Sequence, residues 1–234
     1  MKRRHFNSVP LLALAGLTTF AWEQARALTL DDLTNADAAK GLKAALEKGA
    51  LSAVGLLGAK DGFLGNDKVR IPLPGYLNDA AELLRTFGQG VKVDELLTAM
   101  NRAAEAAVPQ SKELLLKAVQ TMSVTDAKGI LSGGNTSVTD FFASKTRPAL
   151  AVKFLPVVTQ AISKVGLADK YNEVAGRASE LGLVKKEDAN IQQYVTGKTL
   201  DGLFLMISEE EKKIRQNPVG YGNAILSKVF GALQ

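Results

Sequence analysis

Asp201 and the acidic run Glu209-Glu210-Glu211, in the last part of the sequence, are the first candidates for chemistry. Asp201 and Glu209 stand eight residues apart, so a continuous helix would place them near one face and about two turns apart. Together they could hold a divalent cation or act as a pair of acids. The alternative, which we favour, is a solvated face of ion pairs at helical spacing. Those pairs would be Glu209–Lys213 and Glu211–Arg215.

Arg102 and Glu105 form a second candidate, in a segment made mostly of Ala, Leu and Met. Arg102 could be a buried anchor for an anionic ligand. The two residues are also spaced to pair with each other along a helix, and we favour that interpretation.

The loop at residues 61–74 is a third candidate, because its acidic residues could meet a cation. It does not match the EF-hand spacing, and a packed loop between helices is the favoured alternative.

Several chemistries are excluded by residues that the chain lacks. It has no Cys, one His and one Trp, and the last two are His5 and Trp22. Both lie in a segment that we expect to be removed. The remaining domain would then have no catalytic Ser-His-Asp triad, no Cys nucleophile and no disulfide. It would also lack ligands for a conventional zinc, copper, iron–sulfur or His-ligated haem site. Only an oxygen-ligand site for Ca²⁺ or Mg²⁺ stays open.

Residues 1–27 have the layout of a cleavable signal peptide. Basic residues at positions 2–4 precede an apolar run over residues 9–22, and Ala25 and Ala27 suit a signal peptidase that cuts after Ala27. The run is too short for a spanning anchor helix. Arg3, Arg4 and Phe6 resemble a twin-arginine export signal, although an ordinary Sec signal is the alternative. We therefore expect a periplasmic protein with no transmembrane segment in its mature part.

The charge of the chain argues against nucleic acid as a partner. The whole sequence has 29 basic and 24 acidic residues, a net charge of +5. Residues 1–27 contain four of the basic residues and one of the acidic residues, so the mature part would have 25 and 23, a net charge of +2. Such a balanced surface lacks the clustered basic stripe that nucleic-acid binding requires.

Apolar residues recur at helical spacing along residues 28–234, and no convincing alternating strand is present. We predict an all-α fold: one compact domain of short-to-medium helices that follows the signal peptide. The expected helices cover residues 36–57, 75–87, 93–108, 112–122, 147–165, 167–181 and 187–215, with a last helix up to residue 233. Gly49 and Gly55 weaken the first helix, which could break in two. The tetrapeptide Ser-Val-Thr-Asp occurs at Ser123 and Ser137, and at both places it predicts a capping box that opens a short helix.

Several segments of the chain carry a family resemblance. They include Asp61-Gly62-Phe63-Leu64-Gly65-Asn66, Met100-Asn101-Arg102-Ala103-Ala104-Glu105 and Thr199-Leu200-Asp201-Gly202-Leu203-Phe204. With these segments the chain resembles the DUF4197 family of exported bacterial proteins of unknown function, over about residues 28–234. The resemblance implies a single exported domain. It implies no activity and therefore no catalytic residue.

The sequence thus favours a non-catalytic binding or interaction module over an enzyme. Its ligand would be an apolar or amphipathic molecule, or a helix of a partner protein, held in a groove between helices. If polar residues take part, the candidates are Arg102, Glu105, Asp201 and Glu209. The alternatives are a carboxylate-based hydrolase or lyase, with or without Mg²⁺ or Ca²⁺, and an oligomeric structural protein of the envelope. No cofactor is expected, and the sequence leaves the metal, partner and oligomeric state open.

Overall fold

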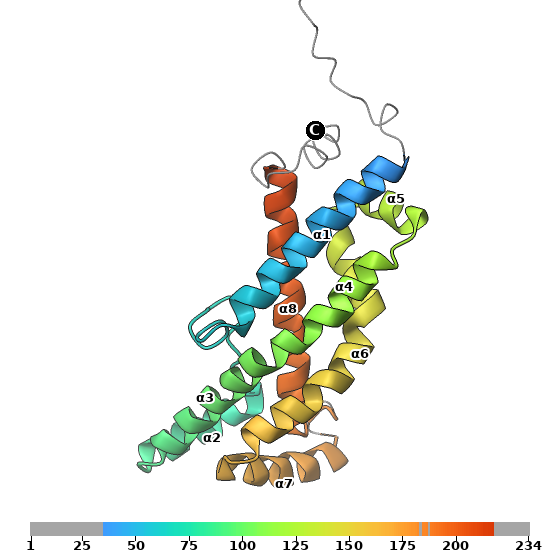
Figure 1. Ribbon diagram of the computed structural model, residues 1–234. Coiled ribbons are helices and arrows are strands. Elements are labelled where there is room, and N and C mark those ends of the chain that lie inside the picture. The colour runs from blue at the N-terminus through green and yellow to red at the C-terminus, as the bar shows by residue number, and fades with distance from the viewer. Residues whose placement is uncertain (1–34, 183, 187, 218–234) are drawn as a thin grey trace, which may run out of the picture.

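The computed structural model describes residues 35–182, 184–186 and 188–217 of the chain, and within these ranges its regular elements are helices (Figure 1). This confirms the predicted all-α fold. The expected signal peptide and the expected last helix lie outside the described residues. None of the described helices combines the length and the apolar composition that a bilayer crossing requires.

Most of the helices follow one another with short connections, and the longer ones precede η2 and α8. In order, they are α1 (Asn35–Gly58), the 3-10 turn η2 (Gly75–Leu77), α2 (Asn78–Thr86), α3 (Gly90–Ala107), the 3-10 turn η3 (Val108–Ser111), α4 (Lys112–Gln120), α5 (Val124–Ser132), α6 (Ser137–Ile162), α7 (Gly166–Glu180) and α8 (Ile191–Gln216).

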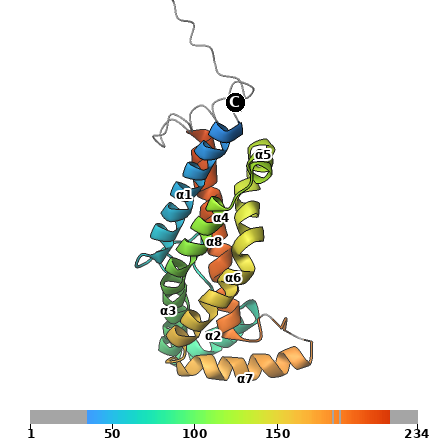
Figure 2. The same cartoon turned by 45° about the vertical axis from the view of Figure 1, so that its right-hand side comes forward.

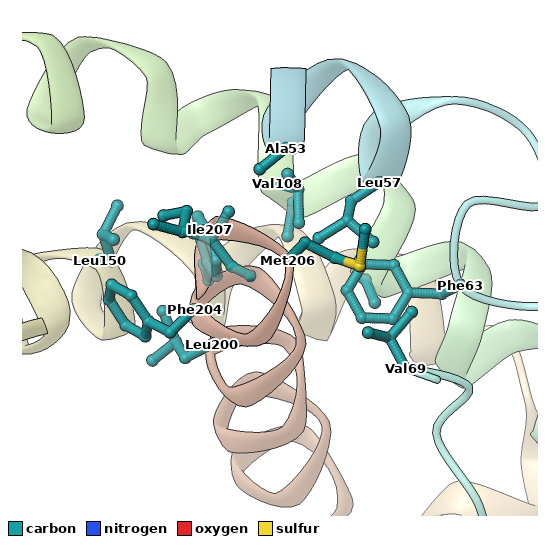
Figure 3. Close-up of a cluster of buried hydrophobic side chains, with 14 of the residues drawn as sticks. Ala53, Leu57, Phe63, Val69, Val108, Leu150, Leu200, Phe204, Met206 and Ile207 are labelled. Carbon is teal, nitrogen blue, oxygen red and sulfur yellow. The ribbon is translucent and has the colours of Figure 1, made fainter. Parts of the chain in front are cut away.

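Helix α8 is the centre of the molecule, and α1, α3 and α6 pack around it (Figures 1 and 2). Both views place α7 across one end, beside α2 and the start of α3, and α5 at the opposite end. Apolar side chains face outward from several sides of α8, while Lys198, Asp201 and Leu205 mark an exposed strip of the helix. In Figure 3, Phe204 lies beside Leu150 of α6, while Met206 points the other way, toward Leu57 of α1 and Phe63.

Local sequence signals set several helix boundaries as predicted. Helix α2 ends before Gly88 and α7 before Gly182, and both glycines have positive φ angles, 75° and 74°. At the start of α5, the Ser123 hydroxyl accepts a hydrogen bond from the Asp126 amide, and the Asp126 carboxylate accepts one from the Ser123 amide. The first Ser-Val-Thr-Asp segment is therefore a capping box.

The second Ser-Val-Thr-Asp segment is not a capping box, and the expectation of a short helix there is wrong. Helix α6 begins at Ser137 and continues as one element to Ile162, through Pro148 and Pro156. A buried apolar stripe spans both prolines and holds the helix together by packing. It consists of Phe142, Leu150, Phe154 and Val158. Helix α1 is likewise continuous through Gly49 and Gly55.

The connection between α1 and α2 packs against the body of the molecule, as expected for residues 61–74. Its Phe63 and Ile71 are fully or almost fully buried. Gly62 allows the first turn, since a Cβ atom there would lie 2.4 Å from the Leu56 carbonyl oxygen. On α8, Gly202 leaves room for the Phe63 ring, because a Cβ atom there would lie 2.7 Å from Phe63 Cε1. This loop is therefore built into the core by contacts distant in sequence.

Candidate functional site

Glu105 of α3 binds the backbone of the loop at residues 59–74. Its Oε1 atom accepts hydrogen bonds from the amides of Phe63 and Leu64, both at 3.1 Å. Its Oε2 atom accepts one from Arg102 Nη1 at 2.6 Å. The Glu105 side chain is buried, so the carboxylate is held by three donors away from solvent.

Arg102 joins the same cluster from one turn earlier on α3. Its Nη2 atom lies 2.7 Å from Asp61 Oδ1, at the start of the loop. The hydrogen bonds from Arg102 to Glu105 and then to Asp61 raise the pKa of the guanidinium, which stays charged. The predicted Arg102–Glu105 pair is therefore confirmed. Both of its members also hold the loop.

Asn101 completes this attachment of the loop. Its side-chain oxygen accepts a hydrogen bond from the Ile71 amide at 2.8 Å, and its side-chain nitrogen donates to the Ile71 carbonyl at 3.0 Å. The buried side-chain amide thus satisfies both backbone polar groups of Ile71, which lies outside any helix or strand. The cluster of Asn101, Arg102 and Glu105 thus fixes both halves of the loop on α3.

Glu209 of α8 reaches the loop from the other side. Its carboxylate accepts hydrogen bonds from Lys68 at 2.7 Å and from Lys212 at 3.0 Å. These two contacts, the one with Lys68 first, lower the pKa of Glu209 from 4.5 to about 2. The carboxylate is therefore ionised throughout the neutral range. A general acid needs the opposite shift.

Asp201 lies apart from the other three candidates. It pairs with Arg147 of α6 and lies 3.9 Å from Lys198 of its own helix. The structure thus brings Arg102, Glu105 and Glu209 to the two sides of one loop and leaves Asp201 at the α6 side of α8. A ligand-binding role for these four residues stays a prediction. Among the described residues, no group of three or more His, Cys, Asp or Glu side chains is placed to hold a metal ion.

The expected solvated face around the acidic run of α8 is wrong for its second and third members. Glu210 and Glu211 are both 3% exposed. Glu211 accepts hydrogen bonds from the amides of Val138 and Thr139 and pairs with Arg215 at 2.9 Å. It therefore caps the start of α6, the role that the sequence suggested for Ser137. Spacing within one helix could not show that a second helix begins beside this carboxylate.

An apolar groove lies between α2, α3 and α7, at one end of the molecule. Its volume is about 190 Å³, and its lining is almost entirely apolar. Residues from each of the three helices and from the loop contribute to it, with Lys170 as the charged member of the lining: Leu73, Leu77, Ala81, Leu84, Val93, Leu96, Leu167, Lys170, Tyr171 and Val174. We call it the α7 groove.

Large apolar side chains extend from the α7 groove onto the surface at the same end of the molecule. Val174 at its edge is 64% exposed, and Leu83, Phe87 and Val91, around the turn between α2 and α3, are 60%, 76% and 69% exposed. We did not predict this surface from the sequence. The available signal was the pattern on α7, where Leu167, Tyr171 and Val174 recur at helical spacing; Leu167 and Tyr171 contact the core, whereas Val174 is exposed.

Comparison with known proteins identifies one family whose model matches most of this chain. The model of a family described as "Protein of unknown function (DUF4197)" matches residues 32–231. No curated protein and no solved structure matches the chain.

Proposed function

The chain belongs to the DUF4197 family, whose function is unknown, and we propose that it is a non-catalytic binding module for an amphipathic helix of a partner protein. The α7 groove is the binding site. The observation that carries this proposal is the coincidence of an apolar groove with exposed large apolar side chains at one end of the molecule.

The size of the groove favours side chains over a whole small molecule. Its volume of about 190 Å³ is below the roughly 300–1,000 Å³ typical of small-molecule sites. A few apolar anchors at helical spacing on a partner helix would fill it. The groove is concave, and its filling needs protruding groups, which a flat lipid surface does not offer. A partner helix therefore fits better than a membrane.

The charges near the groove add a preference. Lys170 lies in the lining and is exposed, so its stem can contact apolar groups while its ammonium stays at the rim. An acidic side chain on the polar face of the partner helix would meet it there. Such a contact would fix the orientation of the helix more than its affinity.

The ion pairs of the candidate acidic residues support a non-catalytic role. Glu105, Asp201 and Glu209 each pair with a basic side chain. The pKa of Glu209 is lowered to about 2, so it cannot deliver a proton near neutral pH. These contacts connect a loop and neighbouring helices, so the three acidic residues have a structural role.

The proposed place of action is the periplasm. Residues 1–27 carry the basic start, apolar run and small residues of an exported precursor, with features of a twin-arginine signal. Cell fractionation with mass analysis of the mature N-terminus tests this. A mature chain that begins at Leu28 in the periplasmic fraction is expected, and an unprocessed chain in the cytosol would contradict export.

Site-specific photo-crosslinking in the producing cell tests the binding proposal. A photoreactive amino acid replaces Val174 in one strain and Val124 of α5 in the other, since Val124 is also exposed, at 49%, but lies at the opposite end. We expect a discrete crosslinked protein from position 174 only, with the crosslink in a helical segment of that protein. Crosslinks to lipid or to a second copy of the chain, or the same product from both positions, would overturn the proposal.

A further inference from the structure

A second groove lies between α6 and α8, on residues that the proposed function does not use. It has a volume of about 430 Å³, within the range of small-molecule sites. Ala151, Val152 and Leu155 of α6 and Leu200 of α8 supply apolar walls, and Val152 is 75% exposed. We call it the α6–α8 groove.

Thr196 lines this groove and has a buried side-chain hydroxyl without a partner among the described residues. The residue is 6% exposed, and its hydroxyl has no hydrogen-bond partner among the described residues. Two other buried threonines nearby behave differently, because Thr146 and Thr199 donate to the carbonyl four residues earlier, both at 2.7 Å. A buried hydroxyl without a partner destabilises the fold. The residue lines the groove, so a rotation about its χ1 angle would bring the hydroxyl to a ligand oxygen there and remove that penalty.

Gly197, beside it, leaves the α8 backbone open to the groove. Glycine inside a helix is less favourable than alanine and usually has a packing reason. At Gly202 that reason is the Phe63 ring, but a Cβ atom at Gly197 would meet nothing within 4 Å. Gly197 also lines the groove. Gly55, Gly129 and Gly176 are equally open inside their helices, so the open space at Gly197 does not by itself indicate a ligand, but it lets a ligand lie close to the α8 backbone.

The charge at one end of the groove favours an anion. Arg147 lines it, pairs with Asp201 through Nη2 and lies with its Cζ atom 5.6 Å from the centre of the Phe204 ring. Lys198 is 3.9 Å from the same aspartate. Two cations thus share one carboxylate, which leaves a net positive charge. A guanidinium has five N–H donors, so Arg147 can hold Asp201 and still donate to a ligand.

From these contacts we propose that the α6–α8 groove binds a single-chain anionic amphiphile. Its carboxylate or phosphate head would lie at Arg147, a carbonyl or hydroxyl would pair with the Thr196 hydroxyl, and its chain would lie along Val152 and Leu155 above Gly197. On α6, Leu155 lies eight residues beyond Arg147, which gives the chain a path of about 12 Å.

Calorimetric titration of the purified protein with N-decanoylglycine tests this proposal. This probe has a carboxylate, an amide carbonyl near it and one apolar chain. We expect saturable binding below its micelle concentration, and no binding of decyltrimethylammonium, which has the same chain and the opposite charge. Decanoyl lysophosphatidic acid then shows whether a phosphate head binds more tightly than a carboxylate. Equal binding of the cation, or no binding of either anion, would overturn the proposal.

Two variants separate a ligand role from a structural one. Thr196→Val removes the unpaired hydroxyl, and Gly197→Ala improves helix propensity, so each should raise Tm by about 2 °C. Each should also weaken N-decanoylglycine binding at least tenfold. Gly129→Ala on α5 is the matched control, since a Cβ atom there also meets nothing within 4 Å, and it should raise Tm with unchanged affinity.

Unchanged affinity in both groove variants would contradict the proposal. So would a dimer in sedimentation that Gly197→Ala dissociates, because the groove would then hold a second copy of the chain. The crosslinking result at Val174 concerns a different surface, so the two proposals can fail independently.

Discussion

At the scale of the residue, Glu105 is the side chain on which the loop at residues 59–74 depends most. Its replacement by alanine leaves the amides of Phe63 and Leu64 without their acceptor and Arg102 without one of its partners. Lost acceptors for buried amides and a broken ion pair should lower the free energy of unfolding by about 3 kcal/mol. Urea unfolding followed by circular dichroism measures this loss.

The control for that variant is Glu113→Ala. Glu113 also forms an ion pair, with Lys153, but its side chain is 87% exposed. Exposed pairs contribute little, so the cost should stay below about 0.5 kcal/mol. Equal costs in the two variants would mean that Glu105 is no anchor of the loop.

Glu209 should make stability depend on pH in a defined window. Its pKa is lowered from 4.5 to about 2 in the folded protein, chiefly by Lys68. The unfolded chain therefore takes up the proton first as the pH falls, so the stabilisation is complete above pH 4.5 and disappears near pH 2. We expect the carboxyl resonance of Glu209 to titrate near pH 2 by NMR, and nearer its ordinary value in Lys68→Met. An identical midpoint in both proteins would rule out Lys68 as the cause.

Among the contacts of the candidate residues, the local ones could be predicted from the sequence and the distant ones could not. The pairing of Arg102 with Glu105 follows from a spacing of three residues and could be predicted. Their contacts with Asp61, Phe63 and Leu64 cross about forty positions of sequence, and no local pattern encodes them. The burial of Glu211 and the unpaired hydroxyl of Thr196 have the same origin, since each depends on which helix lies opposite.

At the scale of the element, Glu211 and Arg215 link three helices. Arg215 Nη2 donates to the Ser137 hydroxyl and to the Ile130 carbonyl of α5, while Glu211 receives the first amides of α6. The Glu211 side chain is 1% exposed and that of Arg215 is 17% exposed. Removal of one partner should cost about 3–5 kcal/mol, because the other charge stays buried.

A double-mutant cycle with Glu211→Gln and Arg215→Met measures this coupling by urea unfolding. The double variant should lose clearly less than the sum of the two single losses, because neither charge is then left alone. Additive losses would show that the two side chains act separately on α6 and α5.

Two glycines of α8, Gly197 and Gly202, should respond differently to replacement by alanine. Gly202→Ala places a methyl group 2.7 Å from Phe63 Cε1, whereas Gly197→Ala meets nothing within 4 Å. The first should destabilise the protein by about 1–3 kcal/mol, and the second should stabilise it slightly. Thermal unfolding of the pair gives the comparison on one helix. A destabilised Gly197→Ala would mean that the groove wall is packed more tightly than the structure describes.

The helices differ in how well their boundaries follow from sequence. The ends of α2 and α7 depend on Gly88 and Gly182, and the start of α5 depends on Ser123, so a few neighbouring residues decide them. The path of α6 through Pro148 depends instead on buried contacts of Phe142, Leu150 and Phe154 with other helices. Proline as a helix breaker is a local rule, and tertiary packing overrides it here.

At the scale of the whole molecule, the end that α7 covers should be locally less stable than the centre of α8. The central part of α8 is buried among α1, α3 and α6, while α7 lies across one end and leaves an apolar groove of about 190 Å³ beneath it. Fewer buried contacts hold α7, so it should open more easily than the centre. Native-state hydrogen exchange should show faster exchange at residues 167–180 than at residues 199–207.

The same measurement connects local stability with the proposed function. A partner helix seated in the α7 groove would bury Leu167 and Val174 and add contacts to α7, so its amides should exchange more slowly in the complex. Amides of α5 at the opposite end should keep their rates, because no new contact reaches them. Slowing across the entire molecule would indicate global stabilisation, and slowing confined to α6 and α8 would place the partner in the other groove. Protection confined to α2, α3 and α7 is the pattern that binding at the α7 groove requires.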